Sequence, residues 1–111
     1  MENASSLCIV LSTWPADAPV EPLLQALVGE RLAACVHVAD AGTSTYRWDG
    51  AVASARERPL AIKTTRGGLA ALETRFRALH PYDVPEWLVV QADGSADYAG
   101  WIAGSVGPAT P

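Results

Sequence analysis

The chain has 111 residues, with eight Lys and Arg against twelve Asp and Glu, and a formal net charge of −4. Half of the residues are hydrophobic, which is typical of one globular domain and excludes a disordered chain. The negative charge and the scattered basic residues argue against nucleic acid as a partner. No apolar run approaches the roughly 20 residues of a membrane span, and no signal peptide is evident, so we expect a cytoplasmic protein with no membrane partner.

The first half of the chain is predicted to alternate strand, helix and strand. The apolar run at residues 7–11 predicts a buried strand, which residues 13–17 should break. An apolar stripe over residues 20–32 predicts an amphipathic helix. Residues 35–48 then read as a strand, in which Gly42 predicts a bend or bulge.

A long hairpin follows. Asp49 and Gly50 are a strong signal for a tight turn, because such turns need positive φ angles. The partner strand covers about residues 52–64, polar in its first half and apolar in its second. The tip of the hairpin should therefore overhang the core, and Pro59 predicts a bulge or a locally unpaired edge.

The second half begins with a helix over residues 66–79, for which Thr65 is the expected N-cap. A proline-containing segment leads from it into a strand at residues 87–90. A short helix is expected after Asp97. The residues that follow Gly104 are expected to be flexible.

The predicted order is β-α-β-β-α-β-α, which indicates an α+β fold of the ferredoxin-like, split βαβ type. We expect a four-stranded antiparallel sheet with two helices on one face, formed by a single domain at residues 7–104. Residues 1–6 are expected to be disordered, and residues 105–111 to form a flexible tail. The bare second sheet face and the overhanging hairpin both require a partner, and self-association supplies it most simply.

The candidate site centres on the segment that runs from His80 to Trp87. Two prolines four residues apart exclude a regular helix there and stiffen the backbone. The segment is either a helix stop followed by a strand start, or a binding site. His80, at a helix end, is either a hydrogen-bonded structural histidine or a ligand. Tyr82 and Glu86 are either a buried phenol and an exposed carboxylate, or ligand contacts.

Three more residues join the candidate set. Lys63 follows an apolar run, so it either extends to water at a sheet edge or forms the positive pole of a cleft. Trp48 and Glu57 lie on the hairpin strands, where packing and ligand contact are the alternatives. No nucleophile elbow, glycine-rich phosphate loop or metal triad is present, so we expect no enzymatic activity. An acid/base reading of His80 is the less favoured alternative.

Ordered motifs along nearly the whole chain resemble the CutA family of divalent-cation tolerance proteins. Each is weak alone, but their order and spacing together are specific. The matching stretches are Glu30-Arg31-Leu32-Ala33-Ala34-Cys35-Val36, Ser44-Thr45-Tyr46-Arg47-Trp48-Asp49-Gly50, Ile62-Lys63-Thr64-Thr65, His80-Pro81-Tyr82-Asp83-Val84-Pro85-Glu86, and Asp97-Tyr98 with Trp101-Ile102.

The resemblance implies a ferredoxin-like subunit in a homotrimer, with hairpin strands that pair between subunits. It also implies binding of copper or another divalent cation, and a role in the response to metal ions. His80 is the position that the resemblance marks for metal contact. Metal-binding members carry a Cys where this chain has Ser12, and they can carry a second His where it has Leu79.

Two functions are therefore considered. The first is a trimeric divalent-cation tolerance protein with a weak metal contact at His80. The second is a trimeric sensor or scaffold, similar to nitrogen-regulatory signal proteins, that binds a small anionic ligand or a protein between subunits. The cleft candidates for the second are Lys63, Tyr82, Glu86, Trp48 and Glu57.

Overall fold

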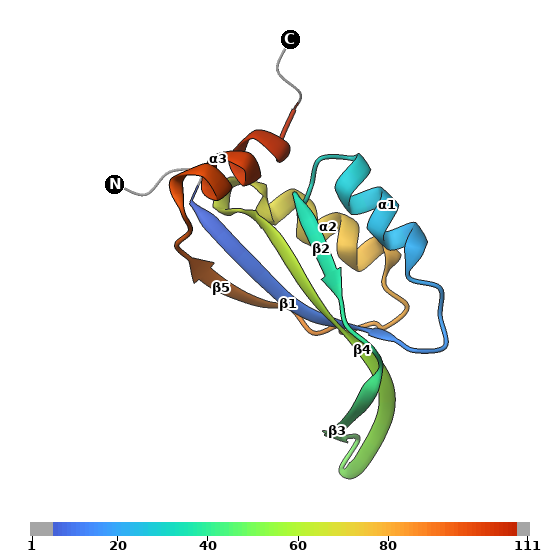
Figure 1. Ribbon diagram of the computed structural model, residues 1–111. Helices are drawn as coiled ribbons and strands as arrows, with labels where there is room; N and C mark the ends of the chain where they lie inside the picture. The colour runs from blue at the N-terminus through green and yellow to red at the C-terminus, as the bar shows by residue number, and fades with distance from the viewer. Residues whose placement is uncertain (1–5, 109–111) are drawn as a thin grey trace.

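The structure, a computed structural model, describes residues 6–108 (Figure 1). The tail expected at residues 105–111 and the disordered start expected at residues 1–6 therefore lie partly outside the described residues. Along the chain the elements are β1 (Leu7–Pro15), α1 (Glu21–Gly29), β2 (Cys35–Val38), β3 (Gly42–Trp48), β4 (Ala51–Thr65), the 3₁₀ turn η1 (Arg66–Gly68), α2 (Leu69–Leu79), β5 (Leu88–Ala92) and α3 (Ala96–Ser105).

All strands belong to one antiparallel sheet, so the α+β class and the antiparallel pairing are confirmed. The order is β2-β4-β1-β5, and β3 also pairs with β4. The sheet has five strands because the predicted strand at residues 35–48 is divided. Val38 lies opposite Leu60 but Gly42 lies opposite Glu57, so the pairing register moves by one residue between them. The bend expected at Gly42 is thus present.

Pro59 lies at this interruption. Its carbonyl accepts a hydrogen bond from the Ala39 N–H at 3.0 Å, so its backbone edge faces the gap between β2 and β3. Proline has no N–H to donate, but no hydrogen bond of the ladder is lost where the strand pairing is already interrupted. On the other side the register with β1 continues without a break, where Pro59 lies opposite Thr13. The expected unpaired edge is therefore confined to one side of β4.

The expected break of the first strand at Thr13 is wrong, because β1 continues to Pro15. Trp14 is buried against the helices, and its Nε1 donates to the Ala18 carbonyl at 3.1 Å. Burial of a side chain this large stabilises the fold by about 2–3 kcal/mol, which outweighs the local turn signal.

Two helices cover one face of the sheet. Alternate residues of β1 and β4, among them Val10 and Ile62, pack against α1 and α2; the core they share also includes Leu23, Leu27, Leu60, Leu72 and Phe76. The third helix lies elsewhere. Ile102 of α3 packs with Leu7 and Ala34 at one end of the opposite face. The rest of that face is open and exposes Leu11, Leu88 and Val90.

β3 and the part of β4 that pairs with it, residues 42–57, extend away from the layers as a hairpin arm (Figure 1). The arm gives the molecule its extents of 49 × 28 × 23 Å. Asp49 and Gly50 both have positive φ at the tip, so the predicted tight turn is confirmed. Within residues 6–108, no helix combines the length and the apolar character that a membrane crossing requires.

Candidate functional site

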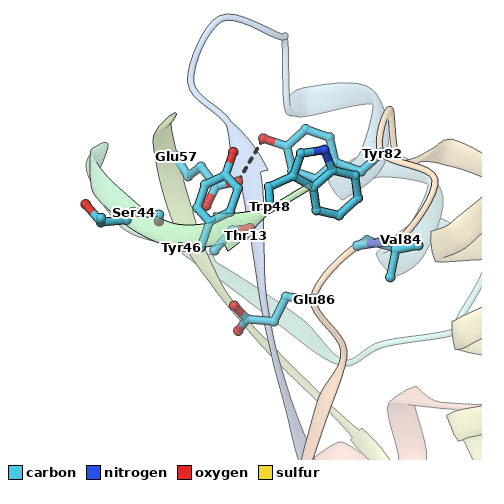
Figure 2. Close-up of a pocket in the computed structure, with 10 residues that line it drawn as sticks. Thr13, Ser44, Tyr46, Trp48, Glu57, Tyr82, Val84 and Glu86 are labelled. Atoms are coloured by element: carbon cyan, nitrogen blue, oxygen red, sulfur yellow. Dashed lines mark hydrogen bonds between the residues drawn. The ribbon is translucent and has the colours of Figure 1, made fainter. Parts of the chain in front are cut away.

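A cavity of about 590 Å³ lies between the hairpin arm and the segment that precedes β5 (Figure 2). Three parts of the chain build it: the arm, the end of β1, and the proline-containing segment. Its lining residues are Thr13, Ser44, Thr45, Tyr46, Trp48, Glu57, Tyr82, Val84, Pro85 and Glu86.

The wall formed by the arm follows from strand geometry. Tyr46 and Trp48 are two residues apart on β3, so their side chains share one face of the hairpin. Their partners on β4 are Ala53 and Ala51, and Ser44 likewise lies opposite an alanine. Small partners leave the space above β4 empty, so the aromatic rings line a hollow instead of packing on large neighbours.

The opposite wall is held in place by three hydrogen bonds. Ser12 Oγ donates to the Glu86 carbonyl at 2.6 Å, and the Tyr82 N–H donates to His80 Nδ1 at 3.0 Å. His80 Nε2 lies 2.8 Å from the Thr13 carbonyl oxygen. Because Pro81 removes one further backbone donor and fixes φ, the segment has little freedom. The proline-containing segment therefore both ends the helix and forms a wall of the cavity that is held in place by hydrogen bonds.

Glu57 and Tyr82 meet inside the cavity. The Tyr82 hydroxyl donates to Glu57 Oε2 at 2.7 Å, and Glu57 is only 8% exposed. Burial, then the hydrogen bond to Glu57 and the nearby acidic groups Glu57, Tyr46 and Asp17 raise the pKa of Tyr82 to about 12. The neutral phenol is thereby maintained as a hydrogen-bond donor to the buried glutamate.

His80 is part of the support beneath this pair. It is 7% exposed, and its ring lies 4.8 Å from the Tyr82 ring and 5.0 Å from the Trp14 ring, centre to centre. Because Nδ1 accepts the Tyr82 N–H, Nε2 carries the proton and donates to the Thr13 carbonyl. Burial lowers the pKa of His80, which favours this neutral form. Both ring nitrogens are occupied, as the structural alternative for His80 requires.

Among residues 6–108, no group of three or more His, Cys, Asp or Glu side chains is placed to hold a metal ion. Ser12, at the position where the resemblance implies a Cys in metal-binding members, donates its hydroxyl to the Glu86 carbonyl. The described part of a single chain therefore offers copper no set of imidazole and thiolate ligands.

Lys63 is not in the cavity. It shares a face of β4 with Glu57 but lies six residues further along, a distance of roughly 20 Å. Lys63 Nζ donates to the Tyr98 hydroxyl at 3.0 Å and lies 5.3 Å from the centre of that ring. This hydrogen bond, more than any other interaction, raises the pKa of Lys63. Within one chain, Lys63 therefore lies on a different part of the surface from this cavity, and its role in a cleft between subunits stays a prediction.

The structure brings together four of the candidates: Trp48, Glu57, Tyr82 and Glu86 (Figure 2). Sequence reasoning assigned no cavity role to Thr13 or Ser44. Ser44 could have been found from its two-residue spacing to Tyr46 and Trp48, but Thr13 could not, because its contact depends on how β1 and β4 pair.

The comparisons with known proteins agree over nearly the whole chain. Residues 8–105 match the family described as CutA1 divalent ion tolerance protein. The divalent-cation tolerance protein CutA of Thermus thermophilus is 41% identical over 100 residues, which cover 89% of this chain and 97% of that protein. The CutA of Yersinia pestis is 37% identical over 92% of this chain and 87% of its own length.

Solved structures give the same result. The divalent cation tolerance protein of Thermus thermophilus superposes with a TM-score of 0.86 at 40% identity, covering 91% of this chain and 99% of that one. CutA from Xylella fastidiosa superposes with a TM-score of 0.87 at 40% identity, covering 92% and 99%. The chain therefore belongs to the CutA1 divalent ion tolerance protein family.

Proposed function

We propose that this chain acts in tolerance to divalent cations as a homotrimer of ferredoxin-like subunits. The observation that carries the proposal is the family match over residues 8–105, together with relatives that are named for divalent-cation tolerance. The strand order supports the ferredoxin-like description, because a split βαβ unit places its first and third strands at the centre of the sheet, and here β1 and β4 are central when β2 and β3 are counted as one divided strand.

Two surfaces support self-association. The open sheet face exposes Leu11, Leu88 and Val90, which are large apolar residues on neighbouring strands β1 and β5. The hairpin arm extends past the body, and within residues 6–108 β3 pairs only with β4, which leaves its other edge available to a partner strand. Exposed apolar patches and free edges of this kind mark interaction sites. Pairing of arms between copies would use the free edge, and packing of the sheet faces of different copies would cover the apolar residues.

Metal contact at His80 stays a prediction, and the geometry sets a cost on it. A metal at Nδ1 would displace the hydrogen bond from the Tyr82 N–H, and one at Nε2 would displace the bond to Thr13. Ser12 and Leu79 supply neither of the additional ligands that metal-binding relatives carry. We therefore expect copper to bind weakly and the protein to keep its fold without copper.

Native mass spectrometry of the metal-stripped protein, titrated with copper and zinc, tests both parts. We expect a trimer, and metal uptake that is lost in His80→Ala and retained in His37→Ala, which changes the exposed histidine. A wild-type protein that is monomeric at micromolar concentration would contradict the assembly. Equal metal uptake by the two variants would contradict His80 as the contact.

The interface has its own matched pair of variants. Val90 and Val28 are both 44% exposed, but Val90 lies on the open sheet face and Val28 on α1. Val90→Glu should convert trimers to monomers because it buries a charge in the interface, whereas Val28→Glu should leave the trimer unchanged. Two variants with the same subunit count would place the interface elsewhere.

A further inference from the structure

We propose that the cavity between the hairpin arm and the proline-containing segment binds a small organic cation through its ammonium group. The proposal goes beyond divalent-cation tolerance and does not rest on it. It follows from the chemistry of the cavity walls, which combine acidic side chains, aromatic faces and no basic group.

The acidic side chains are the first argument. Glu57 and Glu86 line the cavity, and neither forms an ion pair within the described part of the chain. Glu57 is 8% exposed, and its carboxylate accepts a hydrogen bond from the Tyr82 hydroxyl at Oε2. An incoming cation would give the two carboxylates the positive partner that no lining side chain provides.

The aromatic side chains are the second argument. Tyr46, Trp48 and Tyr82 line the cavity together with Glu57 (Figure 2), and Trp48 is 63% exposed. Trp48 lies at the rim of the cavity, opposite an alanine on β4, so a face of its ring is available to a ligand. Faces of Trp and Tyr attract ammonium groups by about 0.5–2 kcal/mol each, and more strongly as water is excluded.

Other ligand classes fit less well. A bare metal ion needs several converging ligands, and residues 6–108 contain no group of three such side chains. An anion would meet Glu57 and Glu86 with no Lys or Arg among the lining residues. Lys63 lies outside the cavity and donates to Tyr98. The volume of about 590 Å³ lies within the range of small-molecule sites and greatly exceeds the space that one ion needs.

Calorimetric titration with choline, and with its neutral isostere 3,3-dimethylbutan-1-ol, tests the proposal directly. The two molecules share shape and size but differ in charge. We expect choline to bind in the millimolar to micromolar range, and the isostere to bind at least about tenfold more weakly. Equal binding of the two, or no heat from choline at millimolar concentration, would overturn the proposal. Acetate and Mg²⁺ serve as anion and metal probes, and tighter binding of either would also overturn it.

Matched variants locate the site. Trp48→Leu and Glu57→Gln should each weaken choline binding by about 3- to 30-fold, the range expected from the loss of one cation–π or charged contact. Trp101→Leu and Asp93→Asn change a tryptophan and an acidic residue at exposed positions outside the cavity, and should leave binding unchanged. Trp48 is exposed and Glu57→Gln can still accept from Tyr82, so both variants should fold; circular dichroism checks this.

Control variants that lose as much affinity as the cavity variants would refute the assignment. Because subunit count is measured separately, failure here leaves the trimer proposal standing.

Discussion

The hydrogen bond between Tyr82 and Glu57 can be removed by Tyr82→Phe with almost no other change. The phenyl ring would keep its 4.8 Å contact with His80, and only the hydroxyl that lies 2.7 Å from Glu57 Oε2 would be lost. Glu57 would remain buried with no described donor in its place.

The expected cost follows from the kind of bond. Hydrogen bonds to charged groups contribute about 1.5–3 kcal/mol, and the cavity lets water reach the carboxylate after the change, which favours the lower end. We therefore expect Tyr82→Phe to reduce the free energy of unfolding by about 1.5 kcal/mol. Tyr98→Phe is the matched control: its hydroxyl accepts a solvent-exposed hydrogen bond from Lys63, and the cost of its loss should stay within about 0.5 kcal/mol.

Urea unfolding measures the difference in the free energy of unfolding between the two variants. Both are measured at the same protein concentration, because the apparent stability of an assembled protein depends on concentration. A double-mutant cycle with Glu57→Ala then isolates the interaction of the two side chains. The two changes should be non-additive by about 1 kcal/mol or more. Additive effects, or a Tyr82→Phe variant as stable as Tyr98→Phe, would refute this account of the buried pair.

Three further predictions concern titration and packing. In an ultraviolet titration one tyrosine should ionise near pH 12, and that step should vanish in Tyr82→Phe; persistence of the step would assign it to another residue. Because burial lowers the pKa of His80, its contribution to stability is complete above the unfolded value of about 6.5 and is lost as the pH falls through the folded pKa. His80→Gln should flatten that part of the acid-side stability curve, and an unchanged slope below pH 6.5 would exclude His80 as its source. Gly68→Ala should cost about 1–3 kcal/mol, since its Cβ would lie 2.8 Å from Val106 Cγ1, while Gly100→Ala, with nothing within 4 Å, should stabilise α3 by about 0.5–1 kcal/mol. Equal urea midpoints for the two glycine variants would contradict that packing.

Local chemistry made much of the fold predictable. Thr65 does cap the turn that precedes α2, where its side chain accepts from the Gly68 N–H at 3.2 Å. Asp49 and Gly50 form the expected turn because the signal lies in two adjacent residues. The end of β1 was mispredicted because the burial of Trp14 depends on helices that the local pattern does not contain.

The site was predictable in its residue types but not in its grouping. Residue type alone singles out Trp48 and Tyr82, and the fold brings them to one cavity. Lys63, which is predicted for a cleft between subunits, lies outside this cavity of the single chain, as its strand spacing from Glu57 indicates. The tautomer of His80 depends on the position of the Thr13 carbonyl relative to the ring, and no sequence pattern encodes that distance.

The central position of β1 has a consequence for the order of folding. Its partners on β4 and β5 are distant in sequence: Leu7 pairs with Thr65 and Ala92. During synthesis at about 5–20 residues per second, this apolar strand leaves the ribosome seconds before its first partner. The hairpin of β3 and β4 contains only near neighbours and can close on its own within microseconds. The chain is therefore expected to build its protruding arm first and to seat its earliest strand afterwards.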